Sequence, residues 1–157
     1  MSTPTFNKIK GLLESKNIVF RTVHHPPTPT SEDAARERGE DIAIGGKAIV
    51  LKVDDAFHLF VLSAARKLNS KAIRKKFGAK KVRFANKEEL WELTELVPGS
   101  VPPFGRPILD LDLYVDTSIT ENDKIAFNAG SLTDSIIFQT EDYLNLAQPE
   151  IFLFSKE

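Results

Sequence analysis

Cysteine is absent from this chain of 157 residues. The absence excludes disulfides, thiolate metal ligands and a cysteine nucleophile, and it favours the cytoplasm, where disulfides are rare. No apolar run approaches the roughly 18 residues that indicate a membrane-spanning helix. Residues 1–5 also lack the apolar core of a secretion signal. We therefore expect a cytoplasmic protein that has no membrane partner.

The sequence also lacks the common motifs for cofactor and metal binding. A phosphate-binding P-loop requires Ser or Thr after its lysine, but Ala48 follows Lys47, and neither a GxGxxG nor a GxSxG pattern occurs. The histidines are His24, His25 and His58. Neighbouring residues of an extended segment point in opposite directions, so His24 and His25 should not bind one metal ion. We expect neither a metal nor a cofactor.

The composition is that of an ordinary soluble globular protein. Hydrophobic residues make up 41% of the chain and charged residues 27%. The length is sufficient to bury a core without disulfides or metals. Because no linker or internal repeat is visible, we expect residues 1–157 to form one domain.

Hydrophobic spacing and capping residues predict the secondary structure. Helices are expected after the capping residues Thr3, Thr30, Asn69 and Asn86, and over residues 141–146. Strands are expected at residues 18–23, 47–53, 57–63, 81–84, 107–115, 125–128, 135–138 and 151–154. Helices and strands mix without strict alternation, which predicts an α+β or irregular α/β fold around a mixed sheet.

A lysine stands at the start of the most apolar of these strands. Lys47 shares a face with Ile49 and Leu51, whereas Ala48 and Val50 point the other way. The two glycines before it allow a ligand or another backbone to come close. An ammonium beside an apolar strand is costly unless a polar or anionic group meets it, so Lys47 is a candidate binding residue. The alternative is a lysine whose stem packs while its head reaches water.

Basic residues are concentrated in residues 66–83. This window holds nine of the 21 lysines and arginines and no acidic residue, although the whole chain carries a net charge of −1. Such a cluster is typical of nucleic-acid binding, and the alternative is a helix face that is merely solvated. The candidates are Arg66, Lys67, Lys71, Arg74, Lys75, Lys76, Lys80 and Lys81.

Residues 99–105, with the sequence GSVPPFG, form a predicted irregular loop. Backbone N–H groups in a glycine-containing loop can hold a carbonyl oxygen or a developing oxyanion. The prolines would fix such a loop at low entropic cost. The alternative is a rigid surface turn, because proline-rich turns are common.

Six short motifs carry a family resemblance. They are His25-Pro26-Pro27-Thr28, Ser31-Glu32-Asp33-Ala34-Ala35, Gly46-Lys47-Ala48, Arg83-Phe84-Ala85, Pro98-Gly99-Ser100-Val101-Pro102-Pro103-Phe104-Gly105 and Phe127-Asn128-Ala129-Gly130-Ser131. In this order they resemble the YbaK family of aminoacyl-tRNA deacylases, which is related to the editing insertion of bacterial prolyl-tRNA synthetase. The resemblance covers residues 23–144.

The resemblance implies an α+β fold with a mixed, partly barrel-like β-sheet surrounded by helices. It implies a free-standing enzyme that hydrolyses the ester between tRNA, usually the proline tRNA, and a small wrong amino acid such as Ala, Cys, Ser or Thr. The implied partner is the acceptor end of mischarged tRNA, with prolyl-tRNA synthetase as a further candidate. The family uses no protein nucleophile, because a hydroxyl of the terminal adenosine or the substrate's own side chain assists the attack.

The resemblance also implies site residues. The catalytic set is Lys47, Gly99 and Ser100. The substrate-binding set is His25, Thr28, Gly46, Val101, Pro102, Pro103, Phe104, Gly105, Asn128, Gly130 and Ser131. Asp134 and Ser135 are neighbours that either line the pocket or serve the core. The chain departs from the family at Glu95, where relatives often carry glycine.

Two other functions are compatible with the sequence. One is a tRNA-binding module of the same fold without turnover, which the presence of Lys47 beside an intact glycine loop disfavours. The other is a hydrolase of small esters or amides, which the basic window disfavours. The oligomeric state is left open.

Overall fold

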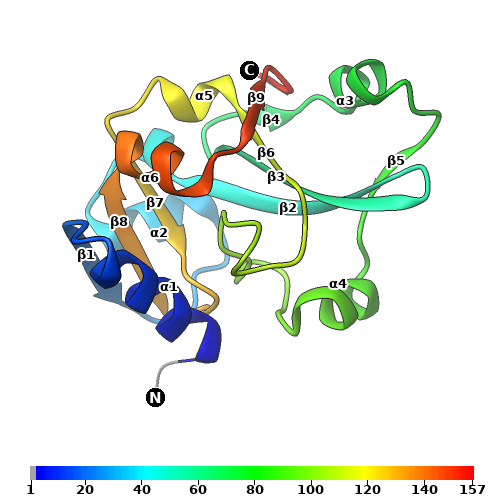
Figure 1. Cartoon of the computed structure of the whole chain (residues 1–157). Helices are drawn as coiled ribbons and strands as arrows, with labels where there is room; N and C mark the ends of the chain where they lie inside the picture. Colours follow the sequence, from blue (N-terminus) through cyan, green and yellow to red (C-terminus); the bar gives the residue numbers. More distant parts are fainter. Residues whose placement is uncertain (1–2) are drawn as a thin grey trace.

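The structure is a computed structural model that describes residues 3–157. Its helices are α1 (Pro4–Ser15), α2 (Ser31–Arg38), α3 (Ser70–Phe77), α4 (Lys87–Thr94), α5 (Thr117–Thr120) and α6 (Thr140–Ala147), with a 3₁₀ turn η1 (Ile42–Ile44). Its strands are β1 (Phe20–His24), β2 (Gly46–Val53), β3 (Ala56–Ser63), β4 (Lys67–Leu68), β5 (Val82–Phe84), β6 (Leu113–Asp116), β7 (Lys124–Asn128), β8 (Asp134–Gln139), β9 (Glu150–Phe152) and β10 (Ser155–Lys156). Figure 1 shows their arrangement.

Two larger sheets dominate the described residues. A five-stranded sheet has the order β5-β2-β3-β6-β9, and a three-stranded antiparallel sheet has the order β1-β8-β7. The larger sheet is mixed, because β2 pairs antiparallel with β3 and β5 while β6 pairs parallel with β3 and β9. A bridge between Gly45 and Ala126 joins the two sheets, which gives the partly barrel-like arrangement. The predicted α+β fold with a mixed sheet is confirmed.

Helices cover both faces of the five-stranded sheet. Ile73 of α3 packs against Leu51 and Phe60 on one face, and Leu90 of α4 packs with Val50 on the other. In Figure 1, α3 accordingly lies above the sheet and α4 below it. Strand β2 is an interior strand with apolar residues on both faces, as its sequence predicts.

The helix boundaries follow the predicted caps. The Thr3 and Thr30 hydroxyls accept the N–H groups of Phe6 and Asp33 at the starts of α1 and α2. Asn86 forms a capping box with Glu89 at the start of α4. Asn69 precedes α3 as predicted, although its side chain makes no capping hydrogen bond.

The strand predicted over residues 107–115 is wrong for most of its length. Only its end, in β6, is extended, because residues before it fold into a turn in which the N–H groups of Ile108 and Leu109 donate to the Gly105 carbonyl. Arg106 bridges this turn through ion pairs of 2.6 Å to both Asp110 and Asp112. Alternating apolar residues therefore line a folded-back loop.

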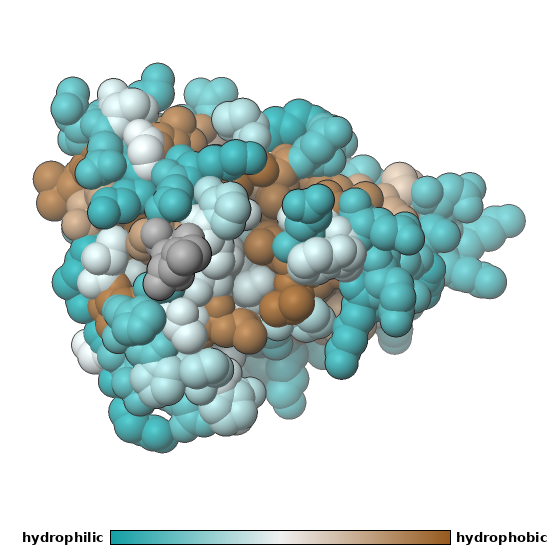
Figure 2. Space-filling view, turned by 90° about the horizontal axis from the view of Figure 1, so that it is seen from below, coloured by the Kyte–Doolittle hydropathy of each residue, from teal (hydrophilic) through white to brown (hydrophobic). Residues whose placement is uncertain are grey.

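The two sides of the large sheet differ in surface character. Figure 2 views the molecule from the side of α1 and α4 and shows apolar residues grouped in the middle of a mostly hydrophilic face. Exposed large hydrophobic residues of the α4 region include Trp91, Leu93 and Val97. The α3 side instead carries the basic window. No helix within residues 3–157 has the length and apolar character needed to span a bilayer.

Candidate active site

A cavity of about 410 Å³ opens between α2 and the start of β2. Its walls come from residues 28–31, helix α2, residues 40–48, Gly99 with Val101, and Ala126 with Asn128 on β7. The volume suits a small molecule or the end of a larger one. Of the residues predicted from the sequence, it gathers Thr28, Gly46, Lys47, Gly99, Val101 and Asn128.

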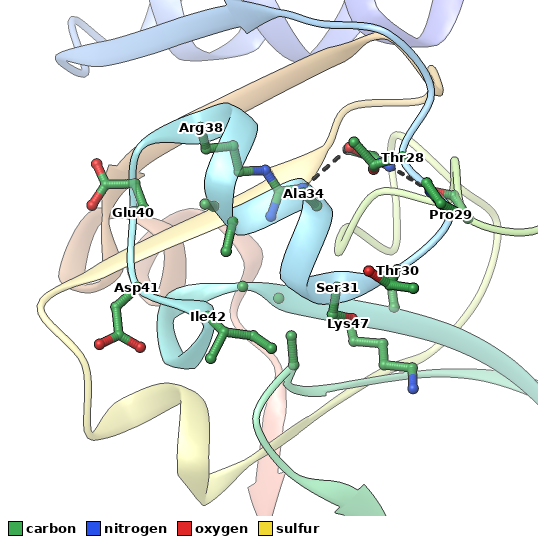
Figure 3. A pocket seen from close by; sticks show the side chains of 18 of the residues that line it. Thr28, Pro29, Thr30, Ser31, Ala34, Arg38, Glu40, Asp41, Ile42 and Lys47 are labelled. Atoms are coloured by element: carbon green, nitrogen blue, oxygen red, sulfur yellow. Dashed lines mark hydrogen bonds between the residues drawn. The ribbon is translucent and has the colours of Figure 1, made fainter.

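Lys47 lies at the open rim of this cavity. Its side chain is exposed, and its ammonium makes no ion pair or hydrogen bond within residues 3–157. Figure 3 shows the lysine extending away from α2 along the edge of the pocket. Close packing leaves no room for a side chain at either glycine before it. A Cβ at Gly46 would lie 2.8 Å from Ile125 Cδ1, and a Cβ at Gly45 would lie 2.9 Å from Ala64 Cβ. The ammonium is therefore available to a ligand.

Arg38 supplies a second cation at the buried side of the same cavity. It is the last residue of α2, and only 9% of its surface is exposed. Its Nε donates to Ser135 Oγ at 2.9 Å and its Nη2 to Asn128 Oδ1 at 3.1 Å, and no carboxylate within residues 3–157 forms an ion pair with it. Burial lowers the pKa of Arg38 to about 10, so the group remains a cation at neutral pH.

Asn128 links this arginine to the glycine loop. Its Nδ2 donates to the Gly99 carbonyl at 2.8 Å while its Oδ1 faces Arg38. Gly99 has φ of +89°, a conformation that favours glycine. The Gly99 N–H has no partner within residues 3–157, and Gly99 lines the cavity.

His25 and Ser135 form a buried pair behind the cavity. His25 Nδ1 lies 2.9 Å from the Pro26 carbonyl, which can only accept, so Nδ1 carries the proton. In the neutral ring Nε2 then accepts the Ser135 hydroxyl at 2.8 Å. His24 points the other way, toward Asp134 at 2.8 Å, as predicted for adjacent strand residues. Neither histidine lines the cavity.

Two acidic residues, Glu40 and Asp41, also belong to the cavity lining. The Glu40 carboxylate is held by Arg21 at 2.6 Å and Lys124 at 3.0 Å. Burial alone would raise the pKa of Glu40, but hydrogen bonds from Lys124 and Arg21 outweigh it and hold the pKa below its ordinary value. Asp41 follows on the same wall. Both carboxylates are engaged within the fold, Glu40 by Arg21 and Lys124 and Asp41 by the Ala43 N–H, and Figure 3 shows them turned away from Arg38 and Lys47.

The remaining predicted site residues lie outside the cavity lining. The Ser100 hydroxyl donates to the Val97 carbonyl at 2.8 Å, and the Ser131 hydroxyl donates to Asp134 at 2.9 Å. Pro102, Pro103, Phe104 and Gly105 are buried. Tyr143 donates to the Pro103 carbonyl at 2.6 Å, and Phe104 stacks edge-on against Phe127. Gly130 accepts the Thr3 hydroxyl and leaves no room for a side chain beside Thr5. These contacts support the walls from behind.

The basic window does not enter the cavity. Helix α3 of this window covers one face of the large sheet. Because side chains alternate along β2, Lys47 points toward that same face. Lys76 is engaged by Glu150 at 2.8 Å, and Arg66 donates to Ser155. The other six predicted tRNA-binding residues form no ion pair through their side chains within residues 3–157; they are Lys67, Lys71, Arg74, Lys75, Lys80 and Lys81.

The sequence profile of the aminoacyl-tRNA editing domain matches residues 25–146, the stretch that contains every wall of the cavity. The chain belongs to the aminoacyl-tRNA editing domain family. The predicted resemblance is thereby confirmed.

Relatives of this editing domain occur alone and within synthetases. The Multifunctional Ser/Thr-tRNA deacylase ProXp-y of Escherichia coli K12 is 34% identical, over 97% of this chain and 93% of its own length. The proline–tRNA ligase of Shouchella clausii is 35% identical over 76% of this chain, which corresponds to 19% of the ligase. A solved structure provisionally assigned as a trans-editing enzyme for prolyl tRNA synthetase has a TM-score of 0.85 at 23% identity, with both chains fully covered.

Arg38 is the site residue that the sequence prediction missed. An arginine near a helix end is normally read as a surface residue that complements the helix dipole. The available signal was its position four residues after Ala34, which places both on one face of α2, and both are buried. Ser135, named only as a neighbour of the pocket, is its partner.

Proposed function

We propose that this editing domain is a free-standing cytoplasmic aminoacyl-tRNA deacylase that removes a small wrong amino acid from the acceptor end of tRNA. The unpartnered Lys47 ammonium at the rim of a 410 Å³ cavity carries the proposal. The deacylase from E. coli supports serine and threonine as the amino acids, and the proline–tRNA ligases support proline tRNA as the carrier. Residues 1–157 would then act as one domain.

The reaction is hydrolysis of an ester. Water attacks the carbonyl carbon, the bond to the ribose oxygen breaks, and that oxygen takes a proton, which yields the free amino acid and tRNA with a free hydroxyl. Lys47 and the Gly99 N–H, which both belong to residues of the cavity lining, would stabilise negative charge on the carbonyl oxygen. The adjacent ribose hydroxyl, or the hydroxyl of the amino acid, would guide the water.

The pair formed by His25 and Ser135 raises a second candidate, a hydrolase with a serine nucleophile. Their separation of 2.8 Å is that of a nucleophile and its base. However, Ser135 is fully buried, does not line the cavity, and already receives a hydrogen bond from Arg38. We infer that the pair holds the wall of the site.

Deacylation assays test both candidates. Proline tRNA charged with alanine, cysteine, serine, threonine or proline is incubated with and without the protein. The proposal expects faster release of at least one wrong amino acid and no acceleration for proline. No acceleration for any of them overturns it. A serine hydrolase would instead cleave a simple activated ester and show an acyl group on Ser135 by mass spectrometry after an acid quench.

A further inference from the structure

The guanidinium of Arg38 is not needed for the hydrolysis described above, yet its burial lowers the stability of the fold. A buried cation without a counter-ion is destabilising unless it is hydrogen-bonded. Its two anchors, Ser135 and Asn128, are neutral. The anchors fix the plane of the guanidinium, so the fold holds one charged group in one orientation at the wall of the cavity.

One edge of this guanidinium faces the cavity. Nη1 has no hydrogen-bond partner within residues 3–157. His58 Nδ1 also lacks a partner but is fully enclosed, whereas Nη1 is not fully enclosed. A Cβ on Gly45 would lie 3.7 Å from Nη1, so the glycine leaves that edge uncovered. Figure 3 shows the Arg38 side chain directed inward past Ala34, whereas Lys47 lies at the opposite rim.

The position of Nη1 selects which part of a substrate can reach it. In an aminoacyl ester the carbonyl is joined to the bulky tRNA and must stay near the open rim, where Lys47 lies. The amino-acid side chain is the free end and enters the cavity first. The buried donor therefore meets the side chain, and the exposed cation meets the ester.

We propose that Arg38 determines specificity, its Nη1 edge donating a hydrogen bond to an oxygen in the side chain of the amino acid being removed. The proposal rests on the proposed deacylase function and assigns to this one residue the discrimination between hydroxyl-bearing amino acids and their apolar counterparts. A guanidinium has no acceptor, so an apolar side chain would leave Nη1 desolvated and without a partner.

The remaining charges of the cavity are consistent with this orientation. The α-ammonium of the substrate would be repelled by Arg38 and by Lys47. Glu40 and Asp41 line the cavity as well, but the first is held by Arg21 and Lys124 and the second accepts the Ala43 N–H. With the amino-acid side chain toward Arg38, the α-ammonium stays away from the buried guanidinium.

The test compares one tRNA charged with serine or with alanine, which differ by a single hydroxyl. The measured quantity is the ratio of kcat/KM for serine to that for alanine. Wild type should favour serine, and Arg38→Met should reduce the ratio about tenfold or more, since a hydrogen bond to a charged group is lost. Arg36→Met, on the exposed side of the same helix, is the matched control and should keep the wild-type ratio.

A second variant separates specificity from folding. Arg38→Lys keeps the buried charge, but its ammonium is a single point of charge and lacks the planar fork that holds Nη1 toward the cavity while Ser135 and Asn128 are bound, so the ratio should fall here too. Equal losses for serine and alanine in both variants would show a purely structural role and overturn the proposal, as would a wild type without preference.

A binding measurement keeps this test independent of turnover. Adenosine linked to serine or alanine through a 3′-amide cannot be hydrolysed, and calorimetry gives its affinity directly. If wild type hydrolyses no charged tRNA, the deacylase function fails, while tighter binding of the seryl than the alanyl compound, lost in Arg38→Met, still supports the role of Arg38. Equal affinities would overturn it.

Discussion

Lys47 and Arg38 line one cavity but depend on different parts of the fold. Lys47 is placed by the alternation of a single strand, so its direction follows from the local sequence. Arg38 is placed by partners about ninety residues away, on β7 and β8. The exposed ammonium is free to follow a moving substrate, whereas the buried guanidinium is fixed. These properties suit catalysis at the rim and recognition in the interior.

Replacement of Lys47 by alanine should abolish most of the deacylation. Loss of one group that stabilises a developing oxyanion costs on the order of 100-fold or more in kcat. The melting temperature should not change, because the side chain is exposed and without a partner within residues 3–157. Single-turnover assays with seryl-tRNA provide the measurement.

Lys52→Ala is the matched control, since this lysine lies on the opposite face of the same strand, with its ammonium 5.7 Å from the Phe57 ring centre. Its rate should remain near that of wild type. If Lys47→Ala kept a rate within a few-fold of wild type, Lys47 would be no more than a snorkelling lysine.

At the scale of the element, α4 ends on an unfavourable residue. Glu95 caps the helix in the left-handed conformation, with φ of +58°. Glycine adopts this conformation without the steric cost that other residues carry. Glu95→Gly should therefore raise the free energy of unfolding by about 0.5–1 kcal/mol, and the melting temperature by about 1–4 °C.

Calorimetry of Glu95→Gly should be paired with Glu92→Gly in the interior of the same helix, which should lose about 1 kcal/mol. A fall in stability for both variants would mean that Glu95 makes a favourable contact that outweighs its backbone strain.

Asp116 ties the end of β6 to the C-terminal segment. Its fully buried carboxylate accepts hydrogen bonds from Ser118 N at 3.0 Å, Phe154 N at 2.6 Å and Ser155 Oγ at 2.6 Å. Burial alone would raise the pKa of Asp116, but these hydrogen bonds outweigh it and lower the pKa. The carboxylate therefore stabilises the fold fully above its unfolded-state pKa of about 4 and progressively less as the pH falls below that value.

Asp116→Asn should lower the free energy of unfolding by about 2–3 kcal/mol at pH 7. The charge-assisted hydrogen bonds are lost, and the new amide NH2 group would face groups that are themselves hydrogen-bond donors. Urea unfolding at pH 7 and pH 3 should show the difference from wild type narrowing at the lower pH. Asp110→Asn, an exposed carboxylate, should change stability by less than about 1 kcal/mol. A difference that is constant with pH would contradict the assigned ionisation.

Elements whose signals are local could be predicted from the sequence. Thr3, Thr30 and Asn86 mark helix starts through contacts three residues away, and β2 and β3 are joined by a tight turn. The loop before β6 could not be predicted, since its shape depends on Arg106 folding back onto two aspartates. The buried state of Arg38 likewise depends on Ser135, which only the folded sheet brings near.

At the scale of the whole molecule, charge is separated between faces. The α3 side carries the exposed residues Lys71, Lys75 and Lys80, whose ammonium groups form no ion pair within residues 3–157. This side of the sheet is also the one toward which β2 directs Lys47. A tRNA that presents its charged end to the rim would therefore have cations available along its backbone, although the net charge of the chain is only −1.

Neutralising this face should weaken tRNA binding in a manner that depends on salt. Lys71, Lys75 and Lys80 replaced together by glutamine should raise KM for charged tRNA and leave kcat unchanged. Each lost phosphate contact should reduce the slope of log K against log salt by about 0.7–0.9. The triple variant of Lys8, Lys10 and Lys16 removes the same charge from α1 and its C-cap and serves as the control. Equal changes in both variants would attribute the effect to net charge alone, and no change in either would leave α3 a merely solvated face.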